Sequence, residues 1–160
     1  MRSIIIFYSY SGNTKKVAEV LVNYLKEKGE VELVELRALD ESSNFFAQAR
    51  RAFYKKRAKL SAVNFDLTKY DTVCLGTPVW AFAPAPAMNA YLDKCVGLEG
   101  KSLILFSTYG SGTGNNRCLN YMQGILVKKG VKVFKRFSIQ QGKVMDKEFV
   151  LSKIKQVVLA

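Results

Sequence analysis

Residues 4–14 read Ile-Ile-Ile-Phe-Tyr-Ser-Tyr-Ser-Gly-Asn-Thr, and this stretch decides the fold. It begins with a continuous apolar run, which is typical of a strand buried on both faces of a parallel sheet. A short polar loop with one glycine follows, and residues 13–28 then carry an apolar stripe of helical period. The stretch therefore predicts a buried strand that passes through a polar turn into a helix.

The same alternation of strand and helix signals continues along the chain. Apolar runs predict strands at residues 3–8, 31–36, 72–75, 102–106 and 131–137. Helical periodicity predicts further helices at residues 44–60, 85–95, 116–129 and 147–159. Because alternating strands and helices pair in parallel through right-handed crossovers, we expect an α/β fold: a three-layer α/β/α sandwich around a five-stranded parallel sheet of order 2-1-3-4-5.

The connection between the second and third predicted strands, residues 37–71, is longer than one crossover helix requires. The helix predicted at residues 44–60 would fill part of it. Its inward stripe would consist of Phe46, Ala49, Phe53 and Leu60. Six basic residues and no acidic one lie between residues 47 and 59. We therefore expect a basic helix in this connection.

Length and composition favour one globular domain. The chain has 160 residues, nearly half of them apolar, and no low-complexity linker. We expect residues 1–160 to form a single domain with a genuine core. No apolar run is long enough to span a bilayer or to serve as a secretory signal. We therefore expect a cytoplasmic protein with no membrane partner.

The residue types that are missing exclude several kinds of chemistry. The chain has no histidine, so it cannot by itself run Ser-His-Asp hydrolysis, Cys-His proteolysis or His-ligated metal chemistry. Cys74, Cys95 and Cys118 are an odd number without Cys-x-x-Cys spacing, which argues against a disulfide framework and a metal site. We expect no metal, and we assign no residue a catalytic role.

Positive charge is in excess and unevenly distributed. The formal net charge is +12, and residues 100–145 contain no acid. Such a surface favours association with an acidic protein, weakening as salt rises. The alternative is a solvated basic face without a specific partner.

Residues 9–14 (Ser-Tyr-Ser-Gly-Asn-Thr) join the first strand to the first helix at the crevice expected for this strand order. Unpaired N–H groups and a positive dipole favour an anion at a helix start, and the hydroxyls add donors. An ordinary polar helix cap is the alternative. The loop lacks the Gly-Lys-Ser/Thr of a Walker loop and the Gly-x-Gly-x-x-Gly of a dinucleotide fingerprint.

This loop is similar to the phosphate-loop signature of the flavodoxins, in which two hydroxyl residues and Gly-Asn-Thr directly follow the first strand. The resemblance to the flavodoxin-like FMN-binding family covers the whole chain and implies flavin mononucleotide (FMN) as the cofactor. By motif match, the ligands of the FMN phosphate would be Ser9, Ser11, Gly12, Asn13 and Thr14, with the backbone N–H of Tyr10.

Residues 76–86 form a second loop, Gly-Thr-Pro-Val-Trp-Ala-Phe-Ala-Pro-Ala-Pro, at the same edge of the sheet. An apolar loop rich in aromatic residues is costly to expose, so Trp80 and Phe82 are candidates to stack on a flat ring. The alternative is that both pack down onto the core. The resemblance implies that the flavin ring is lined by Thr77, Pro78, Val79 and Trp80.

Residues 107–116 form a third loop, with glycines at 110, 112 and 114. It offers backbone donors and acceptors at close range, although flexibility alone would also explain the glycines. The resemblance places Tyr109 over the outer flavin face, with backbone contacts from Thr108 and Gly110 to the polar edge of the ring.

The resemblance implies an electron carrier that passes electrons to or from protein partners. The alternative is an FMN-dependent NAD(P)H:quinone or flavin reductase. Such relatives often oligomerise, so both a monomer and a homodimer stay open. A nucleic-acid-binding module is a third reading, but no nucleic-acid motif is present and the aromatic residues gather away from the basic stretches, so we expect no nucleic acid partner.

The chain departs from the carrier flavodoxins in the sign of its charge, since these are usually acidic around the flavin. Positive charge near a flavin, such as that of Arg117, stabilises an added electron. We therefore predict that the semiquinone/hydroquinone potential of the flavin is less negative than in an acidic flavodoxin.

Overall fold

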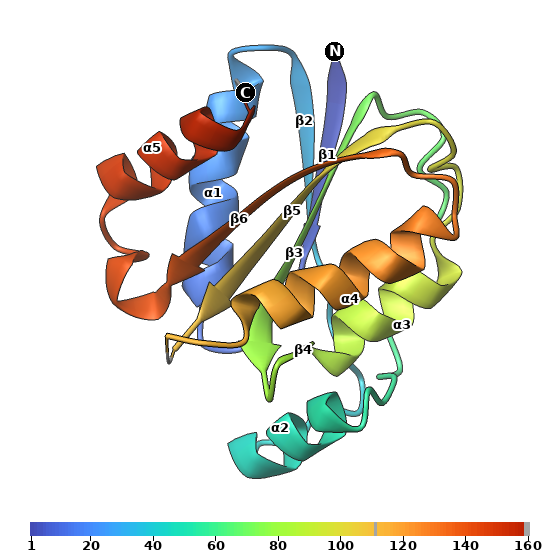
Figure 1. The fold of residues 1–160 in the computed structure, drawn as a ribbon. Coiled ribbons are helices and arrows are strands. Elements are labelled where there is room, and N and C mark those ends of the chain that lie inside the picture. Colours follow the sequence, from blue (N-terminus) through green and yellow to red (C-terminus); the bar gives the residue numbers. More distant parts are fainter. Residues whose placement is uncertain (111, 159–160) are drawn as a thin grey trace.

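A computed structural model describes residues 1–110 and 112–158 of the chain (Figure 1). Its sheet has five parallel strands in the order β2-β1-β3-β5-β6. Their bounds are Arg2–Phe7 for β1, Glu30–Glu35 for β2, Thr72–Trp80 for β3, Ser102–Tyr109 for β5 and Val133–Gln140 for β6. The short strand β4 (Ala83–Pro84) pairs antiparallel with the end of β3 and lies off this path. Counting the parallel strands alone, the predicted order 2-1-3-4-5 is confirmed.

Helices cover both faces of the sheet (Figure 1). On one face lie α1 (Asn13–Lys26) and α5 (Lys147–Val158), and on the other lie α3 (Pro86–Lys94) and α4 (Asn115–Val127). A single 3₁₀ turn, η1 (Gln141–Lys143), follows β6. The helix α2 (Phe45–Phe53) lies outside these layers, beyond the carboxyl ends of the strands. The predicted three-layer α/β/α sandwich is therefore confirmed.

The core consists of two apolar clusters, one on each face of the sheet. Successive residues of β1 point to opposite faces, so Ile4 and Ile6 join the cluster under α3 and α4. Ile5 and Phe7 join the cluster under α1 and α5. Residues 4–7 of β1 are all buried in one cluster or the other, which explains why this run is apolar without interruption.

Three strands run further at their carboxyl ends than the sequence predicted. β3 was expected to end at Leu75, β5 at Phe106 and β6 at Phe137, but they continue to Trp80, Tyr109 and Gln140. For β3 and β5 the reason is that Thr77 and Pro78 keep their parallel pairing with Ser107 and Thr108. Gly76 and Pro78 suggested a loop, yet the ladder between two central strands overrides these local signals.

The helix predicted at residues 44–60 is shorter than expected and turned the other way. Asn44 caps it by accepting hydrogen bonds from the N–H groups of Phe46 and Ala47, and the helix ends at Phe53. Its buried side consists of Gln48 and Ala52, whereas Phe46 is 83% exposed and Phe53 58% exposed. The prediction was therefore wrong for Phe46 and Phe53, because helical periodicity shows which residues share a side but not which side packs. Leu60, beyond the end of the helix, does pack against the core.

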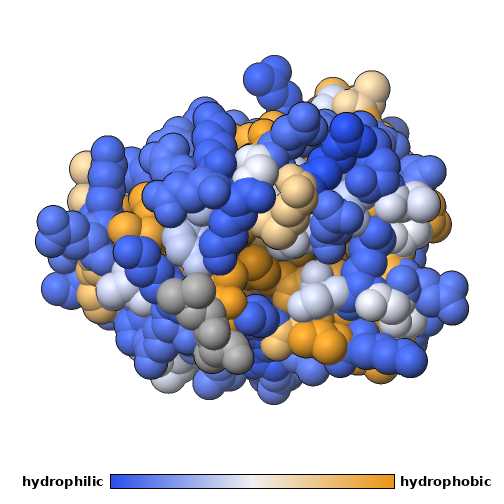
Figure 2. All heavy atoms as spheres, turned by 90° about the horizontal axis from the view of Figure 1, so that it is seen from above, coloured by the Kyte–Doolittle hydropathy of each residue, from blue (hydrophilic) through white to orange (hydrophobic). Residues whose placement is uncertain are grey.

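The strands begin at the end of the molecule opposite to α2. Figure 2 views this end and shows hydrophilic side chains over most of it. The hollow found there measures only about 160 Å³ and is lined in part by Met1, Leu25 and Val158. Among the helices that the structure describes, none combines the length and the apolarity that a bilayer crossing requires.

Candidate functional site

A hollow of about 500 Å³ opens beyond the carboxyl ends of β1, β3 and β5. Its volume lies in the range of roughly 300–1,000 Å³ that is usual for small-molecule sites. The described residues that line it are Tyr10, Ser11, Asn13, Thr14, Phe45, Pro78, Val79, Trp80, Thr108, Tyr109, Gly110 and Gln141. These include every predicted site residue except Ser9, Gly12 and Thr77. The three predicted loops thus meet around one hollow.

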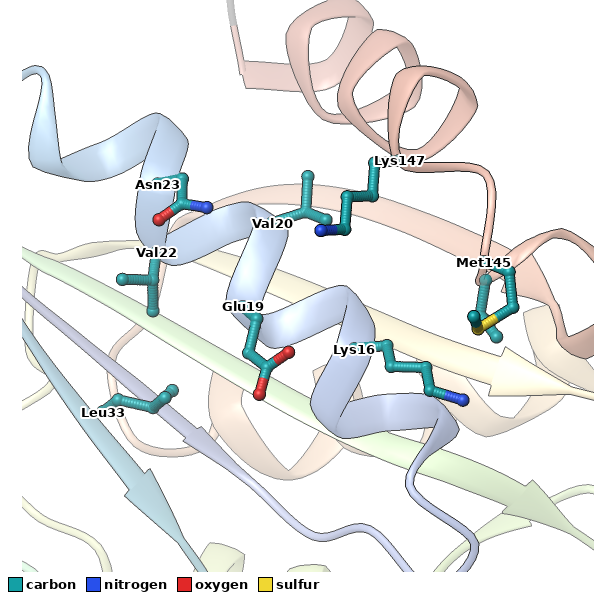
Figure 3. A pocket seen from close by; sticks show the side chains of 9 residues that line it. Lys16, Glu19, Val20, Val22, Asn23, Leu33, Met145 and Lys147 are labelled. Atoms are coloured by element: carbon teal, nitrogen blue, oxygen red, sulfur yellow. The ribbon is translucent and has the colours of Figure 1, made fainter.

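Two other hollows are of similar size, so volume alone does not select the site. One of about 470 Å³ lies between α1, β2 and the start of α5, and one of about 770 Å³ runs along β6. Figure 3 shows the first of these, with Lys16 and Glu19 projecting from α1, Leu33 on β2, and Met145 and Lys147 beside the start of α5. The hollow at the carboxyl ends is distinguished by its position, because it brings the start of α1 together with Trp80 and Tyr109 at the ends of β3 and β5.

The first loop presents the start of α1 to the hollow. Gly12 is the N-cap residue, with a φ of 86°, and it provides no side-chain cap. A Cβ at this position would meet nothing within 4 Å, so the loop needs glycine for its backbone conformation. Ser9 Oγ accepts a hydrogen bond from the N–H of Lys15 at 3.2 Å. Ser9 therefore takes one N–H of the first turn, and the N–H groups of Asn13 and Thr14 are left to an anion.

A buried pair of hydroxyls ties the first loop to the third. Thr14 Oγ1 lies 2.8 Å from Thr108 Oγ1, and both side chains are buried. On the outer side, Gln140 Nε2 donates a hydrogen bond to the carbonyl of Gly110 at 3.2 Å. The loop that would hold a phosphate and the strand end that would contact a ring are therefore fixed relative to each other.

Trp80 forms one wall of the hollow. Its ring meets those of Tyr8, Tyr10 and Phe45 edge-on, with ring centroids 5.6, 5.6 and 5.8 Å apart. These contacts leave Trp80 only 5% exposed. Both interpretations of this residue thus hold in part: Trp80 packs down among aromatic neighbours and still lines the hollow.

Phe82 does not line the hollow, contrary to its candidacy as a ring-stacking residue. The predicted second loop is instead a hairpin, in which Trp80 pairs with Ala83 across a two-residue turn. Ala81 and Phe82 form this turn with φ values of 47° and 67°, a conformation that non-glycine residues rarely adopt. Phe82 is 45% exposed and its ring lies 5.8 Å from the Arg117 guanidinium.

Thr77 is placed beneath the site. Its side chain is fully buried, and Oγ1 accepts a hydrogen bond from the N–H of Ala85 at 3.0 Å while donating to the carbonyl of Pro78. Thr77 therefore holds the hairpin against the start of α3 and supports Pro78 and Val79, which do line the hollow.

Two lining residues were missed by the sequence reasoning. Gln141 follows the carboxyl end of β6, so the rule that ligands gather at this edge of the sheet could have indicated it. Phe45 opens α2, and no local signal connects it with the hollow. Both come from segments outside the three predicted loops.

The described lining of the hollow carries no carboxylate and no ammonium group. Behind Trp80, burial and a hydrogen bond to Glu41 raise the pKa of Tyr8, so this phenol stays protonated. Burial also raises the pKa of the Cys95 thiol to about 11 and that of Cys118 to about 12. The site therefore binds and orients a ligand but holds no side chain poised for acid–base work near neutral pH.

These features define a flavodoxin-like mononucleotide-binding protein. A helix N-terminus with hydroxyls suits a phosphate, and the aromatic and apolar walls from Trp80, Val79 and Tyr109 suit a flat ring. The residues present fit FMN: the first loop would hold its phosphate, and the ends of β3 and β5 would hold its ring system.

The comparisons with known proteins agree. The family model described as NADPH-dependent FMN reductase matches residues 1–144, and the chain belongs to this family. FMN is accordingly its cofactor, and the resemblance to flavodoxin-like FMN proteins is confirmed. No curated protein sequence matches the chain significantly.

Solved structures of similar fold include flavodoxins and an NADH:FMN oxidoreductase. A flavoprotein from Lactobacillus acidophilus in complex with FMN is 20% identical with a TM-score of 0.68, and the match covers 92% of this chain and 98% of that one. Flavodoxin 1 from Bacillus cereus is 18% identical at a TM-score of 0.61, with 97% and 98% covered. An NADH:FMN oxidoreductase in its apo form is 16% identical at a TM-score of 0.66, with 99% and 89% covered. At these identities the likeness concerns the fold.

Proposed function

We propose that the chain is an electron-transfer flavoprotein that exchanges electrons with protein partners through the exposed edge of its FMN. When bound, FMN supplies the redox chemistry, and the chain's own residues bind and orient it. The first loop, which leads into α1, holds the phosphate, and Trp80 and Tyr109 flank the ring. The hydrogen bond between Thr14 and Thr108 fixes this loop relative to the end of β5.

The observation that carries this proposal is the composition of the hollow. Its described lining has no acid–base side chain and no cation aimed inward that would hold the phosphate of a second nucleotide. A carrier needs neither, because its partner meets the flavin edge from outside.

A second candidate function is an FMN-dependent NAD(P)H:quinone or flavin reductase. The family description favours it, and α2 places Arg50, Arg51 and Lys56 around a hollow of about 380 Å³ near the mouth of the site. In that case α2 would meet a dinucleotide phosphate or a neighbouring subunit. A carrier would function as a monomer, whereas a reductase would favour a homodimer.

We further propose a redox partner in the cytoplasm with an acidic docking surface, and the net charge of +12 supports the acidic surface. Binding would weaken as salt screens the surface charges. An association rate that stays constant between 20 and 500 mM salt would remove the charge-based part of this proposal.

Steady-state oxidation of NADH and NADPH by the FMN-loaded protein, with a quinone as acceptor, tests the choice between carrier and enzyme. For a carrier we expect turnover well below about 1 s⁻¹, the lower end of ordinary enzyme rates. Turnover above that value with either nucleotide would establish the reductase. The reaction without quinone, at the same oxygen concentration, is the control.

A further inference from the structure

The exposed side of α2 carries aromatic rings where a surface helix normally carries polar groups. Phe46 is 83% exposed, Phe53 58% and Tyr54, directly after the helix, 64%. Residues seven apart lie on the same side of a helix, so Phe46 and Phe53 form one ridge with Arg50 between them. Gln48, on the opposite side, is buried. The ridge therefore points directly away from the body of the protein.

Unpaired cations border this aromatic ridge. Among the described residues, Arg51 and Arg57 form ion pairs with Asp40 and Asp93, and Lys55 Nζ lies 4.5 Å from the ring centroid of Tyr121. Arg50 and Lys56 form no ion pair. The hollow of about 380 Å³ at the end of α2 is lined by Arg50, Arg51, Tyr54 and Lys56. Arg51 is already paired with Asp40, so Arg50, Lys56 and the phenol of Tyr54 are the groups in this hollow that suit an anionic headgroup.

We propose that this surface, formed by Phe46, Arg50, Phe53, Tyr54 and Lys56, docks the protein on an anionic lipid bilayer. Aromatic rings on the outward side of a helix enter the interfacial region, and the flanking cations bind lipid phosphates. The helix lies on the membrane without crossing it. Because α2 projects beyond the carboxyl ends of the strands, docking holds the mouth of the flavin site beside the bilayer (Figure 1).

Two other occupants fit the surface less well. A second copy seated on this surface would have to cover Arg50 and Lys56, and the hollow that they line holds no described acidic residue to pair with them. The core of a protein interface is depleted in lysine, whereas Lys55 and Lys56 directly adjoin these rings. A bilayer provides anions in excess and a soft apolar layer for rings on a convex ridge.

Vesicle flotation tests the proposal with the FMN-loaded protein. The probes are vesicles of phosphatidylcholine alone and of phosphatidylcholine with an equal amount of phosphatidylglycerol, at 100 mM salt. We expect binding to the anionic vesicles only. Removal of the two exposed rings in the double variant Phe46→Ser/Phe53→Ser should weaken that binding about tenfold or more, since each ring buries apolar area in the interface.

Charge-matched variants separate this surface from the net charge. Arg50→Glu/Lys56→Glu should weaken vesicle binding more than about tenfold, because each cation near an anionic surface contributes about fivefold. Lys147→Glu/Lys155→Glu changes the net charge equally but lies on α5, on the other face of the sheet, and should have much less effect. For the rings, Met145→Ser is the control, since Met145 is 71% exposed near α5.

Several results would overturn the proposal: no binding to the anionic vesicles, equal losses in the two charge variants, or unchanged binding after removal of the rings. A shift from dimer to monomer on Phe46→Ser/Phe53→Ser would assign the ridge to a second copy instead. Displacement of the protein from vesicles by millimolar inorganic phosphate would assign the cationic hollow to a soluble anion. None of these readouts depends on electron transfer, so the proposed function stands or fails separately.

Discussion

The helices α1 and α2 both flank the mouth of the site, and both have an apolar stripe of helical period, yet they use it in opposite ways. In α1 the stripe faces the sheet, where Val17 and Leu21 are fully buried. In α2 the rings of Phe46 and Phe53 face outward, and a glutamine and an alanine pack inward. The comparison teaches that helical period shows which residues share a side of a helix, but not whether that side faces the protein's own core.

The neighbours of each helix explain the difference. α1 is connected by a tight loop to a central strand, so a right-handed crossover must place it on the sheet. α2 sits in the long connection between β2 and β3 and lies beyond the ends of the strands, where no sheet face is available (Figure 1). Its attachments combine apolar contacts, of Phe45 with Trp80 and of Ala52 with the core, and the ion pair between Arg51 and Asp40.

The largest expected effect is the difference in unfolding free energy between a substitution in the stripe of α1 and one in the stripe of α2. Leu21→Ala in α1 should lower the free energy of unfolding by about 2–5 kcal/mol, because it opens a cavity in the core. Phe46→Ala in α2 should change it by less than about 0.5 kcal/mol, because the ring is already in solvent. Urea unfolding measures both values. Equal losses would mean that Phe46 packs within the monomer.

The next effect concerns the hydroxyl bridge that fixes the first loop. Thr14→Val should destabilise the protein by about 1–3 kcal/mol, because it leaves the buried hydroxyl of Thr108 without a partner. The double variant Thr14→Val/Thr108→Val should be less destabilised than the sum of the single variants, since no orphaned hydroxyl remains. Additive losses in this double-mutant cycle, followed by urea unfolding, would show that the bridge contributes nothing.

One glycine substitution at the start of α1 and a control in α4 should change the free energy of unfolding in opposite directions. Gly12→Ala should cost about 1–2 kcal/mol, because φ is positive there, and should weaken FMN binding through the altered loop. Gly124→Ala is the matched control: it lies inside α4, a Cβ there would meet nothing within 4 Å, and it should stabilise the helix by about 1 kcal/mol. Thermal unfolding and FMN titration of both variants provide the measurement. Gly12→Ala with unchanged stability would contradict the left-handed turn.

The smallest expected effect concerns the attachment that follows α2. A hydrogen bond from Arg57 lowers the pKa of the Asp93 carboxyl below its ordinary value. Because the folded-state pKa is the lower one, the stabilisation is complete above the unfolded pKa of about 3.9 and is lost as the pH falls through the folded pKa. The pair is well exposed, so it contributes less than about 1 kcal/mol.

NMR titration of the Asp93 carboxyl in the wild type and in Arg57→Leu measures this shift. Removal of the guanidinium should return the Asp93 pKa toward its ordinary value. Lys155→Leu removes one positive charge on the other face of the sheet and should leave that pKa in place. An Asp93 pKa that is the same with and without Arg57 would show that the ion pair does not form in solution.

The sequence predicts most of the fold, because period and connection length determine it. The five parallel strands, their order and the helices on both faces all follow from apolar runs that alternate with helical stripes. The ends of β3 and β5 were misplaced because pairing between central strands overrides Gly76 and Pro78. The hairpin turn at Ala81 and Phe82 carries none of the Asn or Gly residues that usually announce it.

For the site as well, the residues that local sequence signals place were predicted, and those that tertiary packing places were missed. The three predicted loops meet as expected, because parallel strands bring their carboxyl ends to one edge of the sheet. Phe45 and Gln141 were missed because they reach the hollow through the packing of α2 and the end of β6. Thr77 lies in a matching motif, but its side chain is consumed by hydrogen bonds within the hairpin.

The most direct test of the central claim is a titration of the apo-protein with FMN and with riboflavin, followed by quenching of flavin fluorescence. The account assigns the phosphate to the first loop, so FMN should bind one to one, at least about tenfold more tightly than riboflavin, which corresponds to about 1.4 kcal/mol. Equal affinity for the two flavins would contradict the role of the loop, and no uptake of FMN would contradict the account as a whole.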